Sequence, residues 1–216
     1  MTAAPLAAQE TARRELGDWR GVLCGNSFDN DPTFARLVER LMGEGFPAAA
    51  ERLRAVAESS GPALDALVVE SNRDENLPVV RRHDPLGRRV EEVVFHPSYH
   101  EAGRVFWRSG VLGVRREPGH ELLSGAIAYL LDQQGEGGHA CPVACTAGAI
   151  KLLQRLGTAD QRERFLPGLL ATDYDRRLHA AQFVTEVQGG SDVGANACVA
   201  TAEPGRPGRF RIRGEK

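Results

Sequence analysis

Near residue 176 the spacing of apolar residues changes from a mainly helical period to that of strands, and this change restricts the fold more than any other feature. Before it, apolar side chains recur at i, i+3, i+4 and i+7, as in segment 33–42, which is the period of a helix. After it, apolar residues alternate with arginines in segment 209–214, as in a strand. The sequence therefore predicts a mainly α chain, with a helical domain over 1–176 followed by the first strands of a β domain over 177–216.

Proline, glycine and serine mark the expected ends of the elements. Helices are expected to begin at proline, which is favoured in a first turn, and one is expected to stop at Ser59-Ser60-Gly61. The expected helices are 33–42, 47–58, 62–72, 97–112, 121–134, 142–156 and 159–165. Segment 81–100 is expected to form a small hairpin or an extended arm around the turn at 84–87. The expected strands are 180–185, 196–202 and 209–214.

The last two expected strands are joined by the turn Gly205-Arg206-Pro207-Gly208. Two strands with an open edge are marginally stable alone. We therefore expect the chain to be the front part of a longer protein, with its β domain truncated after Lys216.

Composition excludes several classes of protein. With 216 residues, 42% hydrophobic content and a net charge of −2, the chain has enough apolar residues for a globular core. No apolar run approaches the ~20 residues of a membrane span, and the N-terminus lacks the pattern of a signal peptide. A cytoplasmic location is expected. The arginines are interspersed with acidic residues, which is typical of solvated helix faces, although contact between Arg104, Arg108, Arg115 or Arg116 and nucleic acid stays open.

Residues 182–192, QFVTEVQGGSD, carry the clearest ligand-binding chemistry. Thr185 and Ser191 offer hydroxyl groups, and Gly189 and Gly190 let the backbone approach a flat ligand without a Cβ in the way. The glycine spacing does not match a dinucleotide fingerprint, and Val193 stands where a nucleophile elbow needs glycine. From these residues alone, a ligand loop and a plain turn both stay open.

Three segments resemble a known family. FVTEVQGGSDVGANA, residues 183–197, resembles the flavin-binding signature of the acyl-CoA dehydrogenase family. LGRRVEEVVFHPSYH at 86–100 and GHACPVACTAGAIKLL at 138–153 are similar to the N-terminal domain of its alkylation-response, AidB-type branch. The resemblance covers nearly the whole chain. It implies FAD as cofactor, and a helical N-terminal domain that precedes a middle β-barrel domain.

The resemblance also implies roles for individual residues. Thr185 is expected to place its hydroxyl and amide near flavin N5 and O4, Asp192 to orient the loop, and Glu186 to be structural. The implied cofactor-binding residues are Gln182, Phe183, Val184, Thr185, Gly190 and Ser191. No catalytic residue is assigned within the chain, because the family's general base is expected beyond residue 216.

Two functions follow from the resemblance. The first is α,β-dehydrogenation of an acyl-CoA thioester by an FAD-dependent enzyme, with the chain alone inactive. The second is an AidB-type flavoprotein that binds DNA in the adaptive response to alkylation, through the C-terminal domain, with weak dehydrogenase activity. Either protein is expected to be a homotetramer.

No metal site is expected. His96 and His100 lie four residues apart, but Pro97 begins a helix between them and no third ligand is near. His139, Cys141 and Cys145 lie in an apolar helix, where such a cluster usually reflects packing. The four cysteines, which also include Cys24 and Cys198, are too scattered for a disulfide framework and are expected to be small buried hydrophobes.

Overall fold

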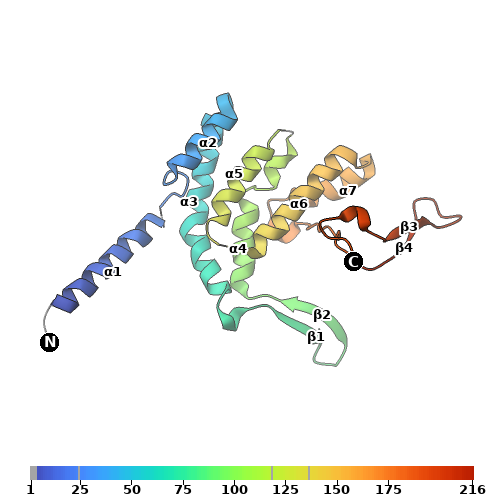
Figure 1. Ribbon diagram of the computed structural model, residues 1–216, viewed down its shortest axis with the longest axis horizontal. Helices are drawn as coiled ribbons and strands as arrows, with labels where there is room; N and C mark the ends of the chain where they lie inside the picture. Colours follow the sequence, from blue (N-terminus) through green and yellow to red (C-terminus); the bar gives the residue numbers. More distant parts are fainter. Residues whose placement is uncertain (1–3, 24, 118, 136) are drawn as a thin grey trace. The chain divides into compact units, whose positions relative to one another are not determined.

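A computed structural model describes residues 4–23, 25–117, 119–135 and 137–216 (Figure 1). The chain forms two compact units, one up to Ala180 and one from Ala181 to Lys216. The first unit is helical, with one β-hairpin between its third and fourth helices, and the second contains a pair of short strands. The fold is therefore mainly α, as the sequence predicts.

The elements follow one another in the order that the hydrophobic period predicts, with additions. The first unit holds α1 (Ala4–Leu23), α2 (Pro32–Met42), α3 (Phe46–Ser71), β1 (Val79–His83), β2 (Arg89–Val94), α4 (Pro97–Arg108), α5 (Glu121–Asp132), α6 (Gly137–Leu156) and α7 (Ala159–Leu169). Its 3₁₀ turns include η3 (Gly113–Arg116) and η4 (Tyr174–Arg176). The second unit holds η5 (Val193–Ala195), β3 (Val199–Ala202) and β4 (Phe210–Arg213).

The core of the first unit lies where α3 packs against α4 and α5, with α6 beside them. Leu53 and Leu64 on α3, Phe106 and Trp107 on α4 and Ile127 on α5 are at most 1% exposed. Burial of each such side chain stabilises the fold by about 1.5–3 kcal/mol. Within the described ranges, no helix has the length and apolarity needed to cross a membrane.

Helix α3 runs without a break through Pro62, so the predicted stop at Ser59-Ser60-Gly61 is wrong. The hydroxyl of Ser60 donates to the carbonyl of Val56 at 2.6 Å, and Ser60 and Gly61 are themselves buried. Proline inside a helix costs about 3 kcal/mol, because it lacks an N–H and crowds the preceding turn. Burial of the apolar face on both sides of Pro62 outweighs this cost.

The ends of other helices differ from prediction in instructive ways. Helix α6 begins at Gly137, so Pro142 lies inside it rather than at its start. Helix α1 was not predicted, although Ala8, Ala12, Leu16 and Trp19 recur at helical spacing along it. Its described side chains are all exposed, so no buried face marks it.

Two predicted helix starts are confirmed by their capping contacts. The carboxylate of Asp31 accepts the N–H of Phe34 at 2.8 Å at the start of α2. At α7, Thr158 and Gln161 form a reciprocal capping box. These polar contacts satisfy N–H groups that the helix itself leaves free.

Segment 81–100 contains a hairpin, which decides between the two predicted alternatives. Strands β1 and β2 pair antiparallel, and Figure 1 shows them as an arm beside the helices. At the turn, one carboxylate oxygen of Asp84 accepts the N–H groups of Leu86 and Arg88, at 2.8 and 2.9 Å. Every residue of both strands is exposed.

In the second unit, β3 and β4 pair antiparallel and lie within the predicted strands 196–202 and 209–214. The predicted strand 180–185 is wrong, because this segment is extended but belongs to no sheet. The carbonyl of Val184 accepts hydrogen bonds from the side chains of Asn196 and Lys216 instead of from a neighbouring strand. The apolar pattern of 180–185 therefore predicted an extended backbone correctly, but the Val184 carbonyl is bonded by side chains and not by a neighbouring strand.

Candidate functional site

The predicted cofactor segment lies in the second unit and is organised around Glu186. The side chain of Glu186 is 3% exposed, and its carboxylate accepts the backbone N–H groups of Ala197 and Cys198 at 2.6 and 3.1 Å. It also accepts the amide of Gln188 at 2.5 Å and pairs with the ammonium of Lys216 at 2.7 Å. Four donors from both ends of the unit therefore meet on one carboxylate.

These contacts change the acidity of two groups. The Lys216 ammonium and then the backbone N–H of Ala197 stabilise the carboxylate and hold the pKa of Glu186 far below its usual range. The same carboxylate, by hydrogen bond and by charge, raises the pKa of the Cys198 thiol. Glu186 is thus the ionised anchor of the loop, in agreement with the expectation that it is structural.

A tight turn follows Glu186. Glu186 and Gly189 exchange backbone hydrogen bonds, with N–H to carbonyl distances of 2.7 and 3.2 Å. A Cβ at Gly189 would lie 2.6 Å from Oδ1 of Asn196 and 2.8 Å from the carbonyl of Asp192, so only glycine fits there. Asn196 in turn donates to the carbonyl of Val184 at 2.7 Å. The turn, the extended segment and the chain after η5 are therefore fastened together.

The predicted cofactor residues are exposed, in contrast to the buried Glu186 and Gly189. Thr185 and Ser191 are exposed, and neither forms a hydrogen bond with another residue that the structure describes. Gly190 is close to Thr185, because a Cβ placed on it would lie 3.8 Å from Cγ2 of Thr185. Phe183 is 80% exposed, and Gln182 and Val184 are exposed beside it. The hydroxyl groups and bare backbone are thus available to a ligand.

The residues that hold this loop were only partly predicted. Asp192 was expected to orient the loop, but its side chain makes no capping bond at η5, and only its carbonyl accepts the N–H of Ala195, at 3.2 Å. The orienting contacts come from Glu186, Asn196 and Lys216. The sequence held a signal for the contact between Glu186 and Lys216. A carboxylate next to an apolar segment needs hydrogen-bond donors, and Lys216 is one of only two lysines in the chain.

A second group of chemistry-bearing residues lies in the first unit, around His139. Its ring is fully buried, stacks on Tyr99 with ring centres 4.1 Å apart, and contacts Trp107 and Tyr174 edge-on. The Nε2–H group donates to the carbonyl of Tyr99 at 2.7 Å. Burial lowers the pKa of His139 to about 4, so the ring is neutral at pH 7. Gly103 makes room for this cluster, because a Cβ there would lie 2.8 Å from the His139 ring.

The metal candidates behave as packing or capping residues. His96 caps α4 by accepting the N–H of Ser98 and hydrogen-bonds its hydroxyl at 2.7 Å, whereas His100 contacts the hydroxyl of Tyr174 at 3.0 Å. Among the described residues, no three His, Cys, Asp or Glu side chains are grouped as a metal site requires.

The prediction of buried cysteines is wrong for the three that can be judged. Cys141 is exposed, Cys145 and Cys198 are half-buried, and Cys24 lies outside the described residues. Cys141 and Cys145 follow the face of α6 that is turned away from the buried His139 and Val143, which explains their exposure.

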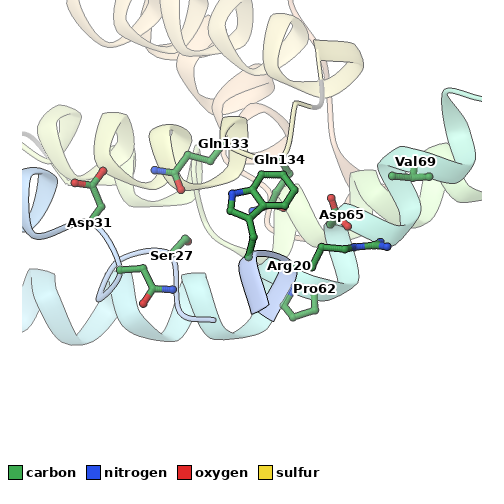
Figure 2. Close-up of a pocket in the computed structure, with 10 residues that line it drawn as sticks. Arg20, Ser27, Asp31, Pro62, Asp65, Val69, Gln133 and Gln134 are labelled. Carbon is green, nitrogen blue, oxygen red and sulfur yellow. The ribbon is translucent and has the colours of Figure 1, made fainter. Parts of the chain in front are cut away.

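Figure 2 shows a cavity of about 550 Å³ in the first unit. Its lining comes from α1, the following loop, α3 and the end of α5, and includes Trp19, Arg20, Asp65 and Gln133. Asp31 at its edge is already engaged, because its carboxylate accepts the hydroxyl of Tyr129 at 2.8 Å.

Comparison with known proteins identifies the family. The family model described as "Adaptive response protein AidB N-terminal domain" matches residues 22–176, which is most of the chain. The chain belongs to this family. The family match covers the helical unit from the end of α1 onward and ends before the Glu186 loop, so the loop's role rests on its own geometry and on the resemblance of its sequence.

Relatives of known sequence and structure agree with this family. The chain is 30% identical over 194 residues to the "Putative acyl-CoA dehydrogenase AidB" of Escherichia coli (strain K12), covering 83% of this chain and 35% of that protein. The fold is similar to Caenorhabditis elegans ACDH-11 in complex with C11-CoA, with a TM-score of 0.74 and 23% identity over 88% of this chain and 33% of that one. It is also similar to the solved structure "Bd2924 apo-form", with a TM-score of 0.71 and 23% identity over 88% of this chain and 39% of that one. The chain thus has the helical N-terminal fold of acyl-CoA dehydrogenases and spans about a third of the length of these relatives.

Proposed function

We propose that the protein serves an FAD-dependent acyl-CoA dehydrogenation, in which hydrogen is removed from Cα and Cβ of an acyl-CoA thioester. Family membership supports the reaction class, and the C11-CoA in complex with ACDH-11 supports the substrate class. The activity is proposed for the protein at the length of its relatives, as a cytoplasmic homotetramer. The observation that carries the cofactor assignment is that Thr185 and Ser191 are exposed beside the backbone of Gly190 and form no hydrogen bond within the described part of the chain.

The residues present fit one edge of a flavin. Thr185 can donate from its hydroxyl and its backbone N–H to acceptors such as flavin N5 and O4, and Ser191 can do the same at the ring edge or toward the thioester ligand. Gly190 has no Cβ to hold a flat ring away from the backbone. Gln182, Phe183 and Val184 back the ring. FAD, when bound, accepts the hydride, and the chain's share is to place donors where negative charge develops.

The ion pair between the buried carboxylate of Glu186 and the ammonium of Lys216 supports the same assignment. Glu186 and Lys216 hold the segment from Val184 to Cys198 in place before any ligand arrives. A fixed loop loses little conformational entropy on binding, which favours affinity. The donors of Thr185 and Ser191 are therefore preorganised for a ligand.

The test is a titration of the chain with FAD, followed by amide NMR shifts. We expect shifts concentrated at residues 182–191. Thr185→Val keeps the branched shape and removes one hydroxyl, and loss of a hydrogen bond worth roughly 1 kcal/mol should weaken binding about fivefold. Thr201→Val on β3 is the matched control and should change nothing. Equal effects of the two variants, or shifts that leave 182–191 unaffected, would exclude the loop as the flavin site.

A second role, association with DNA, is favoured by the description of the family as an adaptive response protein. In this case the DNA surface is proposed to lie in the C-terminal domain of the longer protein. Binding of a double-stranded oligonucleotide should then fall steeply with salt and should not respond to Thr185→Val. A salt-independent interaction, or one that depends on Thr185, would count against it.

A further inference from the structure

Three arginines from separate parts of the first unit line one cavity of about 540 Å³. Arg52 lies on α3, Arg116 ends η3 and Arg176 ends η4, and the lining also includes Pro167, Gly168 and residues 170–173. This volume is in the range of small-molecule sites. All of its lining residues belong to the first unit, whereas the loop around Glu186 belongs to the second.

The positive charges in this cavity are not balanced. None of the three arginines forms an ion pair with an acidic group among the residues that the structure describes. Asp173 is the one acidic residue in the described lining, and its carboxylate accepts the N–H of Asp175 at 3.0 Å. Three arginines against one aspartate leave the concave surface with a net positive charge, which concentrates the field and attracts anions. The cavity is therefore suited to an anion.

The local backbone fixes one of the guanidinium groups. Nη2 of Arg52 donates to the carbonyl of Ser109 at 2.7 Å. Gly110 follows with a φ of 78°, and a Cβ there would lie 2.8 Å from Nη2 of Arg52. Glycine is thus needed both for the backbone conformation and for the position of the guanidinium. A guanidinium has five N–H donors, so this contact leaves further donors for an anion.

A second glycine sets the width of the cavity. A Cβ at Gly113 would lie 2.9 Å from Cγ2 of Thr172 and 3.5 Å from the carbonyl of Leu170. The absence of a side chain lets η3, which carries Arg116, approach the segment that leads to Arg176. Two charges that are 60 residues apart in the sequence are thereby brought to the same cavity.

We propose that this cavity binds a small molecule through a phosphate or diphosphate group. The planar guanidinium group of arginine can donate two parallel hydrogen bonds to two oxygens of one phosphate. Three guanidinium groups suit an anion with at least two negative charges. A concave site takes a compact ligand, whereas a polymer backbone needs charges spread along a surface. The occupant is therefore a phosphorylated metabolite rather than a nucleic acid.

Inorganic pyrophosphate is the probe that tests this site. It is titrated into the whole chain at about 0.15 M salt, where long-range attraction is screened, and NMR follows the amides of Gly110, Gly113 and Thr172 and the Nε–H groups of arginine. We expect saturable shifts confined to these positions. Arg116→Gln and Arg176→Gln should each weaken binding roughly ten- to a hundredfold, since each removes a charged hydrogen-bonding group.

Two control variants distinguish binding in this cavity from nonspecific attraction to positive charge and from binding at the proposed flavin loop. Arg40→Gln on α2 removes an exposed charge elsewhere and should leave the dissociation constant unchanged, as should Thr185→Val in the flavin loop. Shifts that never saturate, or an equal effect of Arg40→Gln, would overturn the proposal. So would a single-stranded oligonucleotide that binds through Arg116 and Arg176 while pyrophosphate does not, because the site would then serve a polymer.

Discussion

The buried imidazole of His139 should make the stability of the first unit depend on pH. Burial lowers the pKa of His139 to about 4, from an ordinary value of 6.5. The folded unit therefore holds a neutral ring, while the unfolded chain takes up a proton as the pH falls below 6.5. Stability from this group is fully present above pH 6.5 and is lost progressively as the pH falls to 4.

The size of the effect follows from the same two pKa values. Each pH unit in this window changes the free energy of unfolding by about 1.4 kcal/mol at most. Acidification from pH 7.5 should therefore remove about 2 kcal/mol by pH 5 and about 3 kcal/mol by pH 4. Losses of this size are a large share of the roughly 5–15 kcal/mol that is typical of folded proteins.

Urea unfolding followed by the fluorescence of Trp107 measures this loss. Trp107 is 1% exposed and contacts the His139 ring, and Trp19→Phe removes the signal of the other tryptophan. His139→Gln serves as the comparison, because glutamine does not titrate but can still donate to the carbonyl of Tyr99. Between pH 7.5 and 4, the unfolding free energy of His139→Gln should fall by about 3 kcal/mol less than that of the protein with His139. Parallel pH profiles of the two proteins would refute the reasoning, whatever their difference in absolute stability.

Two other substitutions test the packing and the loop. Gly103→Ala should lower the unfolding free energy of the first unit by about 1–3 kcal/mol or more, because the new Cβ would lie 2.6 Å from Cζ of Tyr174. Chemical denaturation measures this loss, and wild-type stability would show that the ring has room to move. Glu186→Gln should lower the pKa of the Cys198 thiol, since that carboxylate is what raises it. Alkylation of Cys198 near pH 8 should then be faster, and an unchanged rate, with Cys141 as internal reference, would contradict the assigned contact.

Much of the helical unit could be predicted from sequence, because the signals that begin its helices are local. The apolar period of 33–42, Pro97 and the Thr158 capping box depend only on neighbours within a few residues, and the structure keeps these helix starts. The hairpin turn at Asp84 is equally local. Local contacts of this kind are therefore kept in the folded protein.

The candidate site could be predicted as a segment but not as a structure. The Gly-Gly-Ser-Asp pattern pointed to residues 182–191, of which Thr185, Gly190 and Ser191 are exposed, whereas Gly189 is buried. The contacts that hold this segment depend on the ion pair between Glu186 and Lys216, which are 30 residues apart in the chain. No local sequence pattern predicts such a pair. The same reason explains the wrong strand at 180–185, since an extended segment becomes a strand only if a partner lies alongside.

What the sequence alone determined is the type and order of the elements, because hydrophobic period and capping residues act within a turn or two of the backbone. Only the tertiary structure decided that α3 continues through Pro62, since burial of its apolar face outweighs a local penalty. Only the tertiary structure gathered Arg52, Arg116 and Arg176 around one cavity. Their charges look like separate solvated faces in the sequence, and their convergence depends on close packing at Gly110 and Gly113, which no periodicity encodes.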